Sequence, residues 1–152
     1  TYTNNRRNYT NITEAAFKEE LVRTAEAFKR LTGKTMAPWW RAPYGEHNPE
    51  VLGWAEQVGF KHVDWSRTPV NHDMLDWIAD PGDRNYLDAP ALLNRFLSID
   101  RGSHGGASGA IILCHLGSDR KRDFLDQILP SAIDSLRAKG YEFTTVSAMF
   151  GQ

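Results

Sequence analysis

Apolar residues recur every three or four positions in four segments of the chain. These segments are residues 14–31, 49–58, 90–97 and 125–136. Such spacing places the apolar side chains on one face of an α-helix, so four amphipathic helices are predicted. Thr13 and Gly33 are typical residues for the start and the end of the first helix. Pro130 lies inside the last segment and is expected to bend that helix or split it in two.

Short apolar runs between these helices predict four β-strands. They cover residues 35–40, 60–65, 109–114 and 142–146. The run at residues 109–114 is continuously apolar, which is typical of a strand buried on both faces. Strands that alternate with helices indicate right-handed βαβ units around a parallel sheet or barrel. A closed (β/α) barrel takes roughly 200 residues or more, so earlier strands are expected to be missing from this chain.

Residues 66–88 form the longest predicted loop. They contain Pro69, Pro81 and Gly82 together with many Asp and Asn residues. This composition favours irregular structure, with one helical turn expected around residues 74–78. Loops of this length in compact domains are often functional.

The composition is that of one ordinary globular domain. The 152 residues are 41% hydrophobic and 24% charged, which is enough to bury a core. The 18 Lys and Arg residues balance 19 Asp and Glu residues, so no basic field favours a nucleic-acid partner. No apolar run approaches the roughly 20 residues that a membrane-spanning helix needs. The single cysteine, Cys114, cannot form an internal disulfide.

Reactive side chains follow three of the predicted strands. Residues 41–44 follow the first strand, residues 73–77 lie in the loop after the second, and His115 ends the third. Parallel α/β proteins collect their chemistry at such strand ends. A histidine there can act as an acid or base when an Asp orients it. From spacing alone, a capped loop histidine explains His115 equally well, and core packing explains Trp77 better than a site does.

Taken in order, these segments resemble the polysaccharide deacetylases with a NodB homology domain, carbohydrate esterase family 4. Residues 41–45, Arg-Ala-Pro-Tyr-Gly, are similar to the family's Arg-x-Pro-Tyr motif, and residues 59–63 to its Gly-Phe strand. Residues 76–77 resemble the Asp-Trp pair of the next motif. Residues 109–115 resemble the glycine-led strand that ends in Leu-x-His, and residues 139–143 the closing Lys-Gly-Tyr strand entry. Motifs in this order and at compatible spacing are hard to explain by chance.

The resemblance implies that residues 1–152 are the C-terminal two-thirds of one NodB-like domain, a distorted (β/α) barrel whose first strands are missing from this chain. The family's Thr-Phe-Asp-Asp motif, which supplies the base and a metal ligand, has no match here. Residues 1–4 align with the family's His-Ser/Thr-x-x-His motif from its second position onward, which puts Asn4 where the motif has its second His. Asn4 is therefore a tentative metal ligand, and a polar residue in a turn is the alternative interpretation. The implied cofactor is a divalent metal, zinc, with cobalt or nickel as alternatives.

The resemblance gives each matched residue a role in removing acetyl groups from N-acetylated, GlcNAc-type polysaccharide. His115 would be the general acid, and Asp76 would pair with it to hold the imidazolium. Arg41 would orient the catalytic aspartate of the missing motif, and the backbone N–H of Tyr44 would stabilise the oxyanion. The implied substrate-binding residues are Pro43, Trp77 and Leu113.

Two other functions stay open at this point. A non-catalytic, degenerate NodB-like carbohydrate-binding protein would explain the missing aspartates and Asn4. An esterase that acts on O-acetyl groups of xylan or on aryl esters would use the same residues. The expected partner is a polysaccharide or a chitooligosaccharide, and the family's substrates imply an extracytoplasmic location. Barrel edges left bare by missing strands predict association with another chain.

Overall fold

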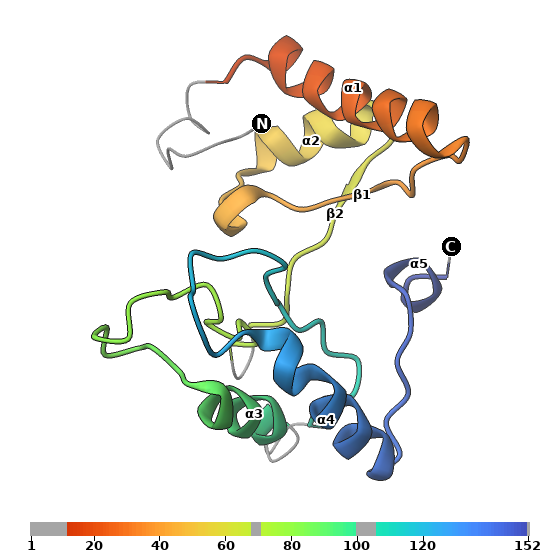
Figure 1. Cartoon of the computed structure of the whole chain (residues 1–152). Coiled ribbons are helices and arrows are strands. Elements are labelled where there is room, and N and C mark those ends of the chain that lie inside the picture. Colours follow the sequence, from red (N-terminus) through yellow and green to blue (C-terminus); the bar gives the residue numbers. More distant parts are fainter. Residues whose placement is uncertain (1–11, 68–70, 100–105, 152) are drawn as a thin grey trace. The chain divides into compact units, whose positions relative to one another are not determined.

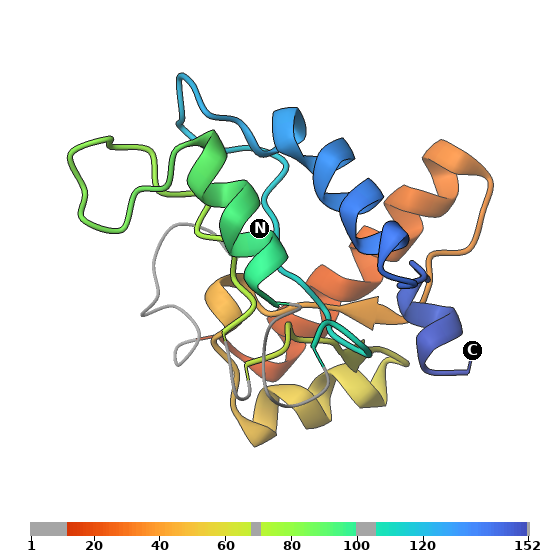
Figure 2. The same cartoon turned by 90° about the horizontal axis from the view of Figure 1, so that it is seen from below.

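The computed structural model describes residues 12–67, 71–99 and 106–151 (Figure 1 and Figure 2). The chain divides into two compact units between Asp64 and Trp65. Residues up to Asp64 are called the first unit, and residues from Trp65 onward are called the second unit. In the described ranges, no helix combines the length and the apolar character that crossing a membrane requires.

The first unit contains two α-helices and a short parallel sheet. In chain order its elements are α1 (Glu14–Thr32), β1 (Trp39–Trp40), the 3-10 turn η2 (Pro43–Gly45), α2 (Pro49–Gln57) and β2 (Lys61–His62). The sheet pairs β1 with β2 in parallel, with Trp40 opposite His62. Helix α2 contacts both α1 and β2. Two parallel strands joined through a helix confirm one of the predicted βαβ units.

Both helices of the first unit begin at the residues that the sequence predicts. The Thr13 hydroxyl accepts a hydrogen bond from the Ala16 N–H at the start of α1. At its end, Gly33 has a φ of 70° and donates its N–H to the Lys29 carbonyl, a left-handed conformation that favours glycine. The Asn48 side chain accepts from the Val51 N–H in the same way at the start of α2. These contacts satisfy backbone groups that a helix end leaves without partners.

The core of the first unit is built around Phe17 of α1. This ring is fully buried and meets Trp40 of β1 edge-on, with ring centroids 5.3 Å apart, and Trp54 of α2 at 6.0 Å. One side chain thus joins two helices and the sheet. The buried residues of this cluster are Phe17, Leu21, Trp40, Ala42, Val51, Ala55 and Phe60.

The second unit is held together by two helices that pack on each other. These are α3 (Ala89–Ser98) and α4 (Leu125–Ala138), and a one-turn helix, α5 (Val146–Met149), lies near the end of the chain. The fully buried Met74 joins the loop before α3 to this helix pair. The buried cluster consists of Met74, Leu92, Phe96, Ile99, Leu125, Ile128, Ala132 and Leu136.

Two of the four predicted strands are wrong, and the other two are shorter than predicted. Residues 109–114 are half-buried or exposed and form only an isolated bridge, Leu113 to Asp73. Their backbone bonds reach Ser66 and residues 72–74, two separate points of an irregular loop, so no regular ladder develops. The described residues therefore contain one two-stranded sheet and no closed barrel.

The last predicted strand, residues 142–146, is also replaced by other structure. A largely apolar cavity of about 680 Å³ is lined both by this segment and by residues 107–112. Thr145 instead caps α5, accepting a hydrogen bond from the Ala148 N–H. The apolar residues of segment 142–146 do not form a strand, because no neighbouring strand in the described part of the chain supplies hydrogen bonds to them.

The helical turn predicted in the long loop is wrong, and of the two outcomes predicted for Pro130, a bent or a split helix, the split is wrong. The helical turn expected at residues 74–78 does not form because Leu75 has a φ of 57°, a left-handed conformation that interrupts any right-handed helix. Helix α4 is not split, since it continues from Leu125 through Pro130 to Ala138. Pro130 lies in its second turn, where the missing N–H removes one intrahelical bond, and the buried face of the helix compensates for it.

Asp123 joins the loop before α4 to the start of α3. Its carboxylate accepts hydrogen bonds from the Tyr86 hydroxyl at 2.7 Å and from the Ala89 N–H at 3.2 Å. The Tyr86 hydrogen bond, followed by that of Ala89, lowers the pKa of Asp123 below its usual range. The same contact raises the pKa of Tyr86. The ionised form of Asp123 therefore stabilises this part of the second unit.

Truncation of α1 at a buried and at an exposed leucine should have different effects. Leu21 is 7% exposed and Leu31 is 80% exposed, on the same helix. Leu21→Ala leaves a cavity beside Phe17, so we expect a loss of about 2–5 kcal/mol in the free energy of unfolding. Leu31→Ala should stay within about 0.5 kcal/mol of wild type. Urea unfolding followed by tryptophan fluorescence measures both, and equal effects would contradict the assigned core.

Removal of the Asp123 charge should lower the stability of the folded protein in a pH-dependent way. Because the folded-state pKa of Asp123 is lowered, its contribution is present above the usual Asp pKa of about 4 and is lost as the pH falls through the folded value. Asp123→Asn should lower the urea midpoint at neutral pH, and the difference from wild type should shrink in acid. Tyr86→Phe removes the main cause of the shift and should give the same pH trend. A difference that does not depend on pH would argue against this carboxylate.

Candidate active site

A parallel bridge brings two loops of the second unit together. Met74 donates its N–H to the Leu113 carbonyl at 3.1 Å, and Leu113 donates to the His72 carbonyl at 3.0 Å. Because the two segments run parallel at this bridge, the residues that follow it leave the pairing on the same side. Asp76 follows one segment and His115 follows the other, which explains how residues 39 positions apart become neighbours.

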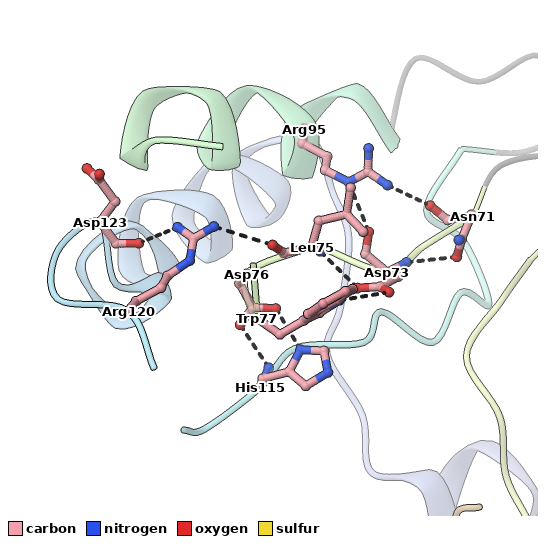
Figure 3. A network of polar contacts seen from close by, with 9 residues as sticks. All are labelled: Asn71, Asp73, Leu75, Asp76, Trp77, Arg95, His115, Arg120 and Asp123. Carbon is pink, nitrogen blue, oxygen red and sulfur yellow. Dashed lines mark hydrogen bonds and ion pairs between the residues drawn. The ribbon is translucent and has the colours of Figure 1, made fainter. Parts of the chain in front are cut away.

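Both oxygens of the Asp76 carboxylate bind His115 (Figure 3). Oδ1 lies 2.8 Å from the imidazole Nδ1, and Oδ2 accepts the backbone N–H of His115 at 2.9 Å. Asp76 is only 3% exposed, whereas the His115 side chain is 31% exposed. An ionised carboxylate can only accept hydrogen bonds, so Nδ1 carries a proton in this pair. The imidazole is thus held at one nitrogen while its ring reaches solvent.

A left-handed turn at Leu75 directs Asp76 toward His115. Leu75 has a φ of 57°, and its N–H donates to Oδ1 of Asp73 at 2.8 Å. A residue with a side chain reaches this conformation only at a cost, so the surrounding contacts must maintain it. The Asp73 side chain is one of these contacts, in the manner of an Asx turn.

Trp77 is an exposed residue of the site and not part of the core. Its side chain is 47% exposed, and its indole N–H donates to Oδ2 of Asp73 at 3.4 Å. Figure 3 shows the indole beside the pair formed by Asp76 and His115. The core-packing interpretation of Trp77 is therefore wrong. An exposed aromatic ring next to a polar pair is suited to contact a sugar or an acyl group.

One group of possible metal ligands occurs in the parts of the chain that the structure describes. It consists of Asp73, Asp76 and His115, whose ligand atoms lie within 4.8 Å of one another. The ligand atoms of Asp76 and His115 already bond to each other, and the Asp73 oxygens accept the N–H groups of Leu75 and Trp77. A metal would have to displace these hydrogen bonds. These hydrogen bonds fit an acid–base pair, Asp76 and His115, supported by Asp73, better than they fit a metal centre.

The first unit holds the other predicted site residues at the end of β1. Tyr44 lies in η2 with a φ of 60°, and its side chain is exposed. The Nε of Arg41 donates to the Val63 carbonyl at 3.1 Å. His62, which the sequence did not single out, accepts the Ala42 N–H through Nε2 at 3.1 Å. These two contacts hold the segment that carries Pro43 and Tyr44 against the end of the sheet.

The predicted site residues thus fall into separate groups. Asp76, Trp77, Leu113 and His115 are brought together in the second unit, and Arg41, Pro43 and Tyr44 lie together in the first. Asn4 lies outside the described residues. The sequence placed Asp73 in the reactive loop segment but gave it no role of its own, and it gave no signal for Arg95 or Arg120.

Comparison with known proteins gives matches over most of the chain. A family model described as polysaccharide deacetylase matches residues 1–63. The chain is 29% identical over 148 residues to the peptidoglycan-N-acetylglucosamine deacetylase of Bacillus cereus, covering 94% of this chain and 45% of that protein. It is 28% identical over 136 residues to the peptidoglycan-N-acetylglucosamine deacetylase PgdA of Listeria monocytogenes, covering 88% of this chain and 23% of that protein. The chain therefore spans less than half the length of these relatives.

Solved structures of a deacetylase and of a related pseudoenzyme also resemble this chain. A peptidoglycan N-acetylglucosamine deacetylase in complex with 4-naphthalen-1-yl-N-oxidanyl-benzamide is 27% identical, with a TM-score of 0.71 over 93% of this chain and 57% of that chain. A pseudoenzyme of carbohydrate esterase family 4 from Bacillus anthracis is 20% identical, with a TM-score of 0.65 over 91% of this chain and 41% of that chain. The second likeness concerns the fold alone. Together with the sequence matches, these structures show that the chain is similar in sequence and fold to polysaccharide deacetylases of carbohydrate esterase family 4.

Proposed function

We propose that the protein containing this chain is a metal-dependent deacetylase that removes acetyl groups from N-acetylglucosamine units of a polysaccharide. The observation that carries the proposal is the buried Asp76 carboxylate, which holds the solvent-accessible imidazole of His115 beside the exposed Trp77. The relatives from Bacillus cereus and Listeria monocytogenes are named as peptidoglycan deacetylases. Peptidoglycan is therefore the first substrate to test, and an extracytoplasmic location goes with it.

His115 has the geometry of a general acid. Amide hydrolysis adds water to the acetyl carbonyl, breaks the C–N bond and leaves acetate and an amine, whose nitrogen must receive a proton. With Nδ1 facing Asp76, Nε2 on the opposite side of the ring is the nitrogen that donates this proton. The carboxylate stabilises the imidazolium before the transfer and keeps the ring oriented during it.

The family resemblance supports a role in this reaction for each of the other predicted residues. The backbone N–H of Tyr44 would donate to the oxyanion that develops on the acetyl carbonyl. Arg41 would orient a catalytic carboxylate supplied by the family's Asp-Asp motif. The apolar surfaces of Pro43, Trp77 and Leu113 would contact the acetyl group and the sugar ring.

Zinc is the proposed cofactor, with cobalt or nickel as alternatives. A divalent metal supplies a Lewis acid and an activated water to such a reaction. Asn4 is the tentative ligand in this chain and lies outside the described residues. An amide oxygen ligates zinc less well than an imidazole nitrogen does, so further ligands of the family's histidine type would be needed.

Substitution of the acid–base pair should abolish most of the activity. In the full-length protein with zinc, we expect His115→Gln to lower kcat for acetate release from chitooligosaccharide or peptidoglycan by about 10²–10⁴-fold, because the proton donor is lost. Asp76→Asn should lower kcat by about 100-fold, because the amide cannot stabilise the imidazolium. Asp119→Asn changes an exposed carboxylate of the loop after His115 and serves as the matched control.

The control variant should retain wild-type kcat and KM. Equal acetate release by wild type and His115→Gln would refute the assigned acid. Parallel assays with an acetylated xylan and an aryl acetate distinguish the esterase alternative, which predicts faster release from esters than from N-acetyl groups.

Removal of metal should stop the reaction without preventing glycan binding. We expect dialysis of the full-length protein against a chelator to abolish acetate release and addition of zinc to restore it, because the metal supplies the activated water. Elemental analysis measures the bound metal, and calorimetry measures glycan affinity in both forms. A protein that binds the glycan but no divalent metal would support the non-catalytic carbohydrate-binding function instead.

A further inference from the structure

Two arginine side chains hold the loop that carries Asp76. Arg95 of α3 donates from Nε to the Asp73 carbonyl at 2.9 Å and from Nη2 to the Asn71 carbonyl at 3.3 Å. Arg120, from the loop after His115, donates from Nη2 to the Leu75 carbonyl at 3.3 Å. Figure 3 shows these contacts along the same loop.

The arginines bind the edge of the loop that the bridge leaves open. His72 and Met74 use their backbone groups to pair with Leu113. In an extended segment, successive residues present their carbonyls to opposite edges, so the residues between and beside these two face away from Leu113. Their carbonyls are the ones that Arg95 and Arg120 bind. The guanidinium groups thus take the place of a neighbouring strand on the second edge.

Arg120 is almost completely buried, which is unusual for a charged residue. It is only 3% exposed, and its Nη1 donates to the carbonyls of Leu87 at 2.8 Å and Asp123 at 2.9 Å. Its guanidinium also lies 4.4 Å from the centre of the Tyr86 ring. Within the described residues, the buried Nε has no hydrogen-bond partner. A buried charge is costly, so its position depends on the carbonyls that it binds, and it fixes them in turn.

Lysine could not replace Arg120 in this position. Three carbonyls from separate segments, at Leu75, Leu87 and Asp123, converge on two nitrogens of one planar group. A guanidinium presents donors in a fixed fork, whereas an ammonium is a compact charge at the end of a flexible stem. The Leu75 carbonyl, which belongs to the left-handed turn, is the longest of these contacts at 3.3 Å. We expect it to be the first to break.

We propose that Arg95 and Arg120 are positioning residues that keep Asp76 paired with His115. This inference rests on the acid–base role proposed for His115. Arg95 fixes the extended part of the loop at Asn71 and Asp73, and Arg120 fixes the turn at Leu75. Without these contacts the strained turn at Leu75 relaxes, and the Asp76 carboxylate moves from the imidazole. Both arginines donate to backbone carbonyls of the chain, so on this proposal they act through the loop and not through the substrate.

The first test observes the pair directly, without enzyme activity. In the full-length protein labelled with ¹⁵N at histidine, the Nδ1 proton of His115 reports its hydrogen bond to Asp76. Asp76→Asn gives the reference spectrum of a broken pair. Arg120→Lys and Arg95→Lys should both move the His115 signal toward that reference. Arg84→Lys changes an exposed arginine of the loop before α3 and should leave the signal unchanged.

The second test is a double-mutant cycle in kcat. Arg120→Lys should lower kcat by about 10- to 100-fold, because displacement of the pair by about 1 Å has effects of this size. KM should change by less than about twofold, because the substrate contacts remain. In the Asp76→Asn background, Arg120→Lys should cause no further loss, since residues that act through the same group are not additive. The control Arg84→Lys should leave both kcat and KM unchanged, in the wild-type background and in the Asp76→Asn background.

The two tests separate this inference from the proposed function. If wild type releases no acetate, the proposed function fails, and the histidine spectra alone decide the inference. A wild-type His115 signal in both Arg95→Lys and Arg120→Lys would overturn it, as would independent, multiplicative losses in the cycle. If Arg120→Lys does not fold, Arg95→Lys, whose arginine is less buried, carries the same two tests.

Discussion

The candidate site of the second unit depends on one carboxylate, that of Asp76, which binds a single histidine twice. Asp76 accepts both the backbone N–H and the ring N–H of His115, so the same side chain holds the end of a chain segment and orients its imidazole. A buried carboxylate is tolerated only where hydrogen bonds replace its lost hydration. This requirement makes the pair sensitive to the backbone on both sides. The bridge at Leu113 sets its register, and the turn at Leu75 sets the direction of Asp76.

Local features of this chain could be predicted from sequence because their causes are local. Thr13, Asn48 and Gly33 each cap a helix through a contact with a residue three or four positions away. The pairing of Asp76 with His115 was also foreseen, although through a family motif. No periodicity relates two residues 39 positions apart. What the sequence offered was a histidine at the end of an apolar run and an aspartate in a long loop, and both proved to lie beside the same bridge.

The errors about strands concern features whose causes lie far away in the chain. A strand exists only where a second segment supplies its hydrogen bonds, so the apolar residues 109–114 could not settle by themselves whether a ladder forms. Arg95 and Arg120 were missed for the same reason. An arginine in a helix such as α3 is typical of a solvated face, and only the folded unit brings its guanidinium to the carbonyls of Asn71 and Asp73.

At the candidate site, the buried guanidinium of Arg120 binds backbone carbonyls that a neighbouring strand would bind in a regular sheet. In a sheet, backbone groups of neighbouring strands satisfy one another, and the geometry repeats along the ladder. Here one guanidinium gathers carbonyls from three segments, including that of Leu75. Such a centre cannot be shifted by one residue without leaving a buried charge or a buried carbonyl without a partner. Polar contacts of this kind contribute little net stability, but they select one arrangement of the loops, and that arrangement is the one in which Asp76 meets His115.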